Sequence, residues 1–535
     1  MPLIPRSRTR TAAWTGVAVL AALLSWAVLG THELGGFVER RLVGALEGRT
    51  EGLYSARLGS LRVRLAGGKL LARDLSVFPD STALERRKLA GRPPRFLARV
   101  EAGQVAIDGL WLAGWLFGRN LQVRADFFRA EGGAITVETA GTSGVRVHRL
   151  AGWQIEAERP QVKPRAPRLG RSLRAADLRA AAESYEMTSE AGVYRLAIAT
   201  ISASTRDSTL RVGRLDFSPT LSESELREAR PEEATRYEAR SGDIEVRGLD
   251  FDALSRQKSI FARSVVVREM AIEVASDLRR SRPSERPRGM PDDALRRLPL
   301  ATLVDTLRII NGAVQYAEIP RDGSRPGVIR FRPIEAQVVA LGNVTGRDAS
   351  PPGSRRAPVA LTARTRVLEA GAFELRAELH LSSADFDFRY EARSLGPLEM
   401  PALNPMFVPN AGVRIDSGRC DSLWLSARAG ETGARGELRA IYRDLHVSMV
   451  DKNDGESSLP QKLASLYANT FQLHEDNLAG GEDAPRLGRI AWDHPRHEPF
   501  FAYWWRSIRS GLYSVIGMEE PHPRSSGEES RRRTR

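Results

Sequence analysis

Two histidines near the C-terminus have the spacing that comes nearest to a metal site in this 535-residue chain. His494 and His497 stand in the stretch DHPRHE, residues 493–498, and imidazole and carboxylate groups are zinc ligands. Pro495 lies between them and breaks the regular helix that would turn both rings to one side. The sequence therefore favours a solvated loop over a metal site.

Acidic residues that alternate along predicted strands are the next candidates. Asp385, Asp387 and Glu391 have the spacing of one strand face, and so do Asp250 and Asp252. Paired carboxylates can act as general acid and base, but the solvent-facing side of a half-buried strand also accounts for both groups. We interpret both as the polar face of a sheet.

The single cysteine, Cys420, alternates with apolar residues, which predicts a buried strand thiol rather than a nucleophile. One cysteine excludes an intrachain disulfide and a CxxC zinc site. The chain also lacks the motifs GxSxG, GxxxxGK[ST], GxGxxG and HExxH. We therefore expect no catalytic residue, no metal and no cofactor, and a protein that is not an enzyme. An envelope hydrolase with an unfamiliar site is the remaining alternative.

The chain carries 80 basic and 66 acidic residues, a net charge of +14. A basic surface attracts nucleic acid or anionic lipid headgroups, whereas an Arg-rich composition is also typical of a GC-rich genome. The positive charge is scattered along strands and linkers and forms no single stripe of the kind that a nucleic-acid groove needs. We expect no nucleic-acid partner.

An N-terminal apolar segment predicts a membrane anchor. Arg6, Arg8 and Arg10 precede the segment, which spans residues 12–30, and a helix of this length nearly crosses a hydrocarbon core of about 30 Å. Basic residues on the N-terminal side predict a cytoplasmic N-terminus and export of the rest. A cleaved signal peptide is the alternative, although Val28 and Leu29 make a poor cleavage site.

Alternating apolar residues dominate the chain from residue 54 onward and predict strands. Gly67-Gly68 separates two such runs and predicts a hairpin turn. A unit of glycine, any residue, Val or Ile, any residue and an apolar residue recurs at irregular spacing, which predicts an extended antiparallel sheet rather than a propeller. Its copies begin at Gly103, Gly133, Gly242, Gly312 and Gly327.

Strands with one apolar face must cover that face by closing, by packing a second sheet, or by curling into a trough that holds apolar ligand. The inward strand positions are the candidate lining of such a groove, although a slip of one residue would invert the face. These candidates are Leu61, Val63, Val105, Ile107, Ile244, Val246, Val314 and Tyr316.

Few segments have helical spacing. The apolar spacing predicts an amphipathic helix over residues 34–46, which lies on the membrane or caps the β core. It predicts further helices over residues 172–186, 222–229, 291–298 and 459–473. The predicted organisation is a cytoplasmic stub (1–11), the anchor (12–30), a first β half (31–280), a linker (281–299), a second β half (300–450), a helical region (451–518) and a disordered tail (519–535).

The last predicted helix, residues 499–516, is rich in aromatic residues and has one apolar face. Such a face fits a membrane interface or a partner groove, or else covers the open end of the β core. The residues that carry it are Phe501, Trp504, Trp505, Ile508 and Leu512.

The order of anchor, amphipathic helix and strand meander resembles the AsmA-like proteins of Gram-negative envelopes. The stretch from Gly68 to Val77 is similar to their motif GxLLxxDLxV, and residues 303–318 and 436–445 resemble one subgroup of the family. The resemblance implies an inner-membrane protein whose bulk lies in the periplasm. It also implies an elongated, open β-taco or groove, related to the bridge-like lipid transfer proteins, that takes part in lipid transport and outer-membrane biogenesis.

Two functions follow as hypotheses. The first is handling of membrane phospholipid in the groove. The second is an assembly scaffold that docks an envelope protein partner through a strand edge or through residues 499–516.

Overall fold

The protein is described here by a computed structural model. The chain has two compact units, a first unit of Met1–Leu226 with Arg240–Phe261 and a second unit of Arg227–Ala239 with Ala262–Arg535. No described helix is long and apolar enough to cross a membrane. The predicted anchor, the predicted helix at 34–46 and the predicted helix at 459–473 lie outside the described residues. These are 50, 52–64, 67–94, 96–110, 123–141, 144–162, 173–189, 192–229, 235–279, 290, 295–296, 298, 300–343, 358–380, 387–453, 474–478, 484–494 and 500–517.

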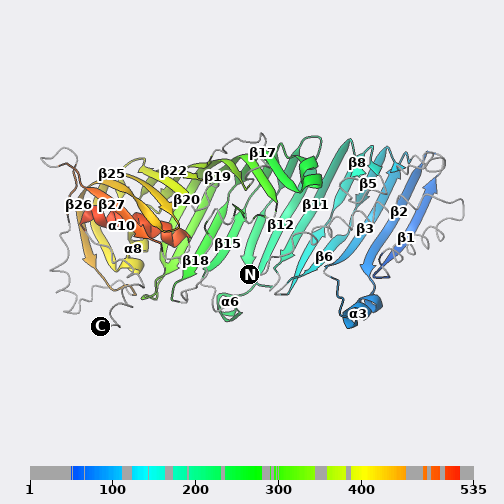
Figure 1. Ribbon diagram of the computed structural model, residues 1–535, viewed down its shortest axis with the longest axis horizontal. Coiled ribbons are helices and arrows are strands. Elements are labelled where there is room, and N and C mark those ends of the chain that lie inside the picture. Colours follow the sequence, from blue (N-terminus) through cyan, green and yellow to red (C-terminus); the bar gives the residue numbers. More distant parts are fainter. Residues whose placement is uncertain are drawn as a thin grey trace. The chain divides into compact units, whose positions relative to one another are not determined.

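The first unit is an antiparallel meander (Figure 1), in which β1, β2 and β3 pair in chain order and β11 pairs with β12. The predicted Gly67-Gly68 turn joins β1 to β2, and both glycines have positive φ (85° and 58°). The strands are β1 (Tyr54–Arg64), β2 (Lys69–Pro79), β3 (Phe96–Asp108), β5 (Phe127–Glu131), β6 (Ala134–Ala140), β7 (Val145–Ala151), β8 (Gln154–Glu158), β11 (Asp177–Thr188), β12 (Tyr194–Ser204), β13 (Thr209–Val212), β14 (Leu215–Pro219) and β16 (Ile244–Arg247).

Short elements border this meander. Helix α3 (Ser81–Leu89) joins β2 to β3, α6 (Glu223–Ala229) follows β14, and a π-helical turn, η1 (Ala253–Gln257), follows β16. A small separate sheet consists of β4 (Val123–Arg124), β9 (Gln161–Val162) and β10 (Leu173–Arg174). Two strands, β15 (Thr235–Ser241) and β17 (Ser259–Arg268), lie where the chain passes between the units.

A line of matched bulges, which we call the crease, crosses the strands from β1 to β14, and the pairing register is the same on its two sides. In β2 and β12 it falls on Asp74 and Thr200, both at φ 54°. In β11 it falls on Glu183, and in the other strands glycines occupy it. Three strands are divided there: β5 from β6 at Gly132-Gly133, β7 from β8 next to Gly152, and β13 from β14 next to Gly213. Each bulge adds one residue, so the apolar spacing across it is three instead of two, as from Leu58 to Leu61.

Because every strand of the meander shifts by the same single residue, the apolar face stays continuous on both sides of the crease. Two of the repeated glycine units that the sequence shows, at Gly103 and Gly133, begin on it. Glycine is needed at Gly133 because φ is +76° and a Cβ there would lie 2.4 Å from the carbonyl oxygen of Glu101.

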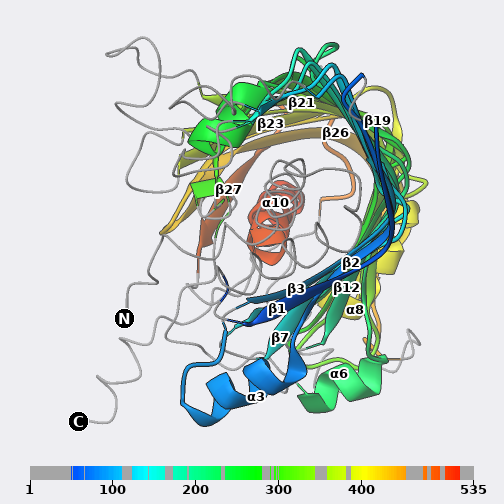
Figure 2. The ribbon, with the colours of Figure 1, turned by 90° about the vertical axis from the view of Figure 1, so that its right-hand side faces the viewer.

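The second unit is a curved sheet that surrounds a helix. Figure 2 shows α10 (Phe500–Ile516) within the curve of the sheet, and α8 (Asn404–Ala411) packs on β20 and β25. The sheet consists of β18 (Ala271–Asp277), β19 (Ala301–Ile319), β20 (Gly327–Gly342), β21 (Val359–Val367), β22 (Gly371–Leu379), β23 (Asp387–Ser394), β24 (Leu398–Glu399), β25 (Val413–Gly430), β26 (Gly433–Met449) and β27 (Leu487–Asp493), with a 3₁₀ turn, η3 (Met400–Leu403).

The structure confirms a mainly β fold and differs from the sequence predictions in several elements. The sheet is mixed, because β18 and β19 pair in parallel. The predicted helix at 172–186 is wrong: this segment contains β10 and β11. Its alanine content favours a helix, but alternation of Leu178, Ala180 and Ala182 places small apolar side chains on the face shared with β8 and β12. Strand β27 lies within the region predicted as helical.

Replacing Gly133 by Ala tests the crease. We expect Gly133→Ala to lower the free energy of unfolding by about 2 to 3 kcal/mol, since it combines a positive φ with a backbone clash. Gly192→Ala is the matched control, because φ is +69° there but a Cβ would meet nothing within 4 Å. Equal losses in the two variants, measured by chemical denaturation, would contradict a tight crease.

Candidate functional site

The predicted chemical groups have structural roles where the structure describes them. His494 packs against Tyr503, with ring centroids 4.1 Å apart and the rings tilted by 35°, and its Nδ1 lies 3.2 Å from the carbonyl oxygen of Glu431. His497 lies outside the described residues. Among the residues that are described, no group of three or more His, Cys, Asp or Glu side chains could hold a metal ion.

The alternating acids pair with basic or polar neighbours on the sheet. Arg428 Nε donates to Asp387 Oδ1 (2.8 Å), and the indole Nε1 of Trp424 donates to Glu391 Oε1 (2.7 Å). Asp385 is outside the described residues. The strand interpretation of Asp250 and Asp252 is wrong, because both lie at the start of a helical turn: Asp250 Oδ1 accepts from Ala253 N (2.8 Å), and Asp252 Oδ1 lies 3.2 Å from Arg256 Nη2.

Cys420 is buried in β25, as predicted, and donates a weak hydrogen bond to the carbonyl oxygen of Ser422 (3.2 Å). Burial raises the pKa of its thiol to about 12, so the reactive thiolate is scarce at neutral pH. This residue is a core thiol.

The predicted groove residues of the first unit lie on one face of its sheet. Directly paired residues of antiparallel strands share a face, and the pairs through Leu61, Val105 and Val246 form one uninterrupted line across β1, β2, β3, β5, β8, β11, β12, β13 and β16. We call this line the first apolar row. Its members are Leu61, Ala72, Val105, Ala130, Ile155, Ala180, Ala203, Leu210 and Val246.

A second apolar row runs on the same face beyond the crease. It consists of Ala56, Val77, Val100, Ile135, Leu150, Tyr185, Ile198 and Leu215. The other candidates lie next to the first row: Ile107 is buried in β3, and Ile244 is half-buried and pairs with Val212. Val63 of β1 is paired with Leu70 of β2, and only the backbone of Val63 is described.

The opposite face of this sheet is polar. The line of paired residues next to the first apolar row, on the other face, contains one alanine and otherwise polar or charged side chains. It consists of Ser60, Arg73, Gln104, Glu131, Gln154, Ala181, Ser202, Arg211 and Glu245. The two faces therefore differ completely in polarity, and the apolar cluster that the structure describes in this unit consists of strand and turn residues without a helix.

The remaining two groove candidates lie in the second unit. Val314 is half-buried, whereas Tyr316 is 3% exposed and its ring centroid is 6.0 Å from that of Phe501 in α10. Tyr316 OH donates to Glu318 Oε2 (2.6 Å), and Arg506 of α10 lies 3.8 Å from the same buried carboxylate. Here the helix of the chain itself packs on this part of the apolar face.

The predicted aromatic residues of α10 pack against the core of the second unit. Phe501 and Trp505 contact the cluster around Tyr316 and Met406, and Trp504, Ile508 and Leu512 contact the larger cluster. These contacts agree with the alternative in which residues 499–516 cover the β core. Binding of a membrane or a partner through the same residues stays a prediction.

Serines of α10 also bind the edge strand β27, which pairs with β26 on its other side. Ser510 Oγ accepts from Ala491 N (3.1 Å) and Ser514 Oγ accepts from Arg489 N (2.9 Å). A covered edge cannot recruit a further strand. The serine spacing along this helix is a signal in the sequence that apolar periodicity alone does not reveal.

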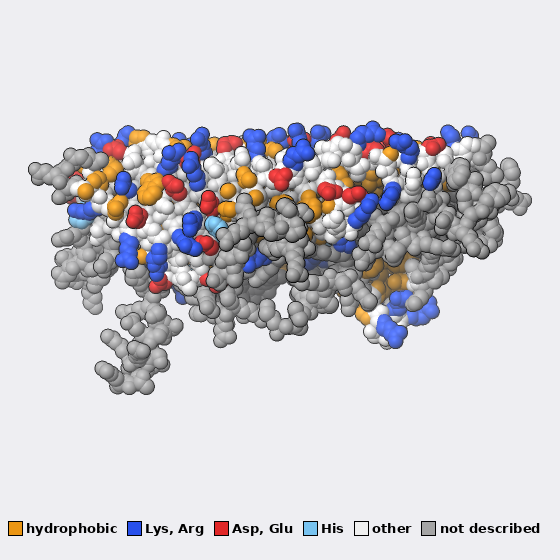
Figure 3. Space-filling model, turned by 45° about the horizontal axis from the view of Figure 1, so that its top comes forward, with side chains coloured by type: hydrophobic (Ala, Val, Ile, Leu, Met, Phe, Trp, Pro, Cys, Tyr) orange, Lys and Arg blue, Asp and Glu red, His pale blue; other side chains and the backbone are white. Residues whose placement is uncertain are grey.

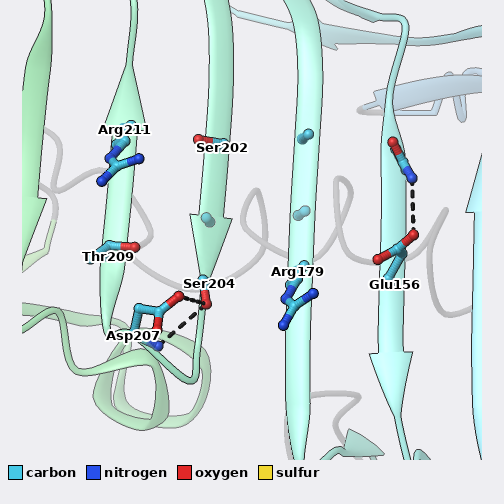
Figure 4. A pocket seen from close by; sticks show the side chains of 11 residues that line it. Glu156, Arg179, Ser202, Ser204, Asp207, Thr209 and Arg211 are labelled. Carbon is cyan, nitrogen blue, oxygen red and sulfur yellow. Dashed lines mark hydrogen bonds between the residues drawn. The ribbon is translucent and has the colours of Figure 1, made fainter.

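A shallow pocket of about 360 Å³ lies on the polar face of the first unit (Figure 4). Its side chains already pair: Arg179 Nε is 3.1 Å from Asp177 Oδ2, and Ser204 Oγ donates to Asp207 Oδ2 (2.8 Å). The pocket has no histidine beside its serines, so it lacks the base that would activate a hydroxyl nucleophile. It is a hollow in a charge-paired surface.

Comparison with known proteins finds no family model that matches this chain and no curated protein that matches it.

Three buried groups of the second unit predict a loss of stability in alkali. Burial raises the pKa of Tyr390 and Tyr442 from 10.0 to about 12, and that of Cys420 from 9.0 to about 12. The unfolded chain releases these protons at lower pH than the folded chain does. Their contribution is therefore complete below pH 9 and is lost as the pH rises toward 12.

The rate of Cys420 modification by a thiol reagent, measured across a denaturant series at each pH, reports opening of this unit, since the chain has no other cysteine. We expect Tyr390→Phe to reduce the decline between pH 10 and 12 by up to about 2 kcal/mol. The exposed Tyr237 provides the control variant Tyr237→Phe, which should leave the decline unchanged. A stability that does not depend on pH in this range would contradict the prediction.

Proposed function

We propose that this protein is a membrane-anchored, non-enzymatic lipid-handling protein that binds acyl chains along the apolar face of its first unit. The observation that carries the proposal is the pair of uninterrupted apolar rows, matched by a polar line on the opposite face. The resemblance to AsmA-like proteins adds phospholipid transport in envelope and outer-membrane biogenesis as the process.

The dimensions of the first apolar row suit a lipid chain. The row crosses nine strands, and strands about 4.8 Å apart give it a length of roughly 40 Å. One leaflet of a bilayer has acyl chains of about 15 Å, half of a hydrocarbon core of about 30 Å. A row of this length accommodates an extended acyl chain without a polar interruption, and an open groove would let the headgroup stay in water.

The second unit supports the proposal by contrast. There α10 packs on the apolar face, so burial is supplied by the chain itself. In the first unit the described cluster consists of strand and turn residues, and we assign its apolar face to the ligand. We place the protein in the inner membrane through residues 12–30, with the N-terminus in the cytoplasm and the bulk in the periplasm.

An assembly scaffold is the second candidate, and one observation favours it. Among the described residues, β1 pairs with β2 alone, whereas α10 covers the edge of β27. The outer edge of β1 is thus the place where a partner strand could add. Arg57, Arg62 and Arg64 lie along this strand, and charged residues oppose indiscriminate pairing.

Photo-crosslinking in the membrane tests which face meets lipid. A photoreactive residue at Leu210, in the first apolar row, should crosslink to phospholipid, detected by mass spectrometry of the labelled peptide. The same residue at Arg211, which belongs to the polar line, should not. Crosslinks of equal yield at both positions, or none at Leu210, would contradict acyl-chain binding and favour the assembly scaffold.

A buried charge should expel the lipid. Ile201 lies in β12, pairs with Val212 of β13 and packs against the apolar cluster of the first unit. We expect Ile201→Glu to lower lipid crosslinking at Leu210 about tenfold or more, since an unpaired carboxylate in an apolar site costs several kcal/mol. Ser202→Glu is the matched control, because it adds the same charge at the next residue on the exposed polar face. Ile201→Trp, which fills the face without charge, separates occlusion from misfolding. Unchanged crosslinking in Ile201→Glu and Ile201→Trp would argue against the rows as the binding surface.

A further inference from the structure

Helix α3 carries basic side chains that the lipid-binding face does not use. It follows β2 directly, and Asp80 caps it by accepting a hydrogen bond from Ala83 N (2.8 Å). Figures 1 and 2 show it projecting from the end of β2, away from the sheet of the first unit. Ala83 is its one buried residue, so nearly the whole helix faces solvent.

The basic side chains gather at the C-terminal end of α3. Arg86, Arg87 and Lys88 form its last turn, and Arg92 follows shortly after it. The segment from Asp80 to Arg92 contains these four cations and two carboxylates, Asp80 and Glu85, so it is basic overall. Figure 3 shows these basic side chains gathered on the helix next to an apolar area.

Cations at a helix C-terminus also complement the helix dipole, and this accounts for part of the cluster. It does not account for Leu89, which is 87% exposed and is the most exposed of the large hydrophobic side chains that the structure describes. An exposed leucine beside several cations can contact a membrane surface, where the apolar side chain meets the headgroup region and the cations meet lipid phosphates.

The helix also lies where the described chain begins. Arg87 Nη2 donates to the carbonyl oxygen of Thr50 (3.3 Å), and Asp80 N donates to that of Leu53 (2.8 Å). The predicted membrane span, residues 12–30, comes shortly before Thr50 in the sequence. A short connection would hold α3 close to the bilayer surface.

We propose that α3 docks on the surface of an anionic phospholipid bilayer. Leu89 inserts among the headgroups, and Arg86, Lys88 and Arg92 lie over the lipid phosphates. The proposal rests on the proposed function only in placing the protein at a membrane; it does not depend on lipid binding to the apolar rows.

The test uses the full chain with the buried Cys420 replaced by Ala and a single new cysteine, Leu89→Cys, that carries a polarity-sensitive fluorophore. The protein is reconstituted into vesicles of phosphatidylcholine alone or mixed with phosphatidylglycerol, and quenching by nitroxide-labelled lipid is measured. We expect a blue shift and quenching in the anionic vesicles alone, reversed by high salt. A label at the exposed Leu395 of the second unit, Leu395→Cys, should show neither.

Charge variants complete the test. Removing three cations, as in Arg86→Gln with Lys88→Gln and Arg92→Gln, should weaken the contact of the label by about two orders of magnitude, since each cation contributes roughly fivefold. The control removes three exposed arginines of the second unit: Arg308→Gln, Arg389→Gln and Arg439→Gln. This control has the same net charge as the α3 charge variant, and the contact of its Leu89 label with the vesicles should equal that of the parent chain.

Equal quenching in both kinds of vesicle, or an unchanged signal in the α3 charge variant, would overturn docking on anionic lipid. Lipid crosslinking at Leu210 is measured on the same preparations. Loss of the Leu89 signal with crosslinking intact counts against α3 alone, whereas loss of crosslinking with the Leu89 signal intact counts against the apolar rows alone.

Discussion

A sheet with one apolar face keeps that face continuous across an extra residue when the neighbouring strands carry the same extra residue. An unmatched extra residue instead needs a local shift of the pairing register, as between β19 and β20 of the second unit. The crease of the first unit satisfies this condition at Gly59, Asp74, Gly103, Glu183 and Thr200, which stand at one level of successive strands. Both apolar rows, and hence the proposed function, depend on that match.

The two units solve the same problem of covering an apolar face in different ways. In the second unit α10 supplies aromatic side chains to the face and serine hydroxyls to the edge strand β27, so one helix satisfies both apolar and polar demands. In the first unit the described helices lie at the borders of the sheet. We therefore assign the proposed lipid handling to the first unit, because the second unit covers its apolar face with its own helix.

Much of this arrangement was accessible from residue patterns, and the exceptions have physical causes. Alternation predicted the strands and put Leu61, Val105 and Val246 on one face, because period two is a local property. The same local rule failed at β11, where alanine suits helix and strand alike and the pairing with β8 and β12 decides. The parallel pair β18–β19 joins segments separated by more than twenty residues, a choice that no local pattern encodes. The apolar spacing of three at the crease is visible in the sequence, but it indicates a crease only when several strands are compared.

The crease separates two ways in which such a protein can change over evolution. Inserting a residue into one strand breaks the match with its neighbours, so the pairing constrains the width of the sheet. Adding a whole hairpin that carries its own bulge leaves every existing pair intact and lengthens both apolar rows by two strand spacings, roughly 10 Å. Proteins built on this plan should therefore differ in the number of strands while the strands keep the same length and the same position of the crease.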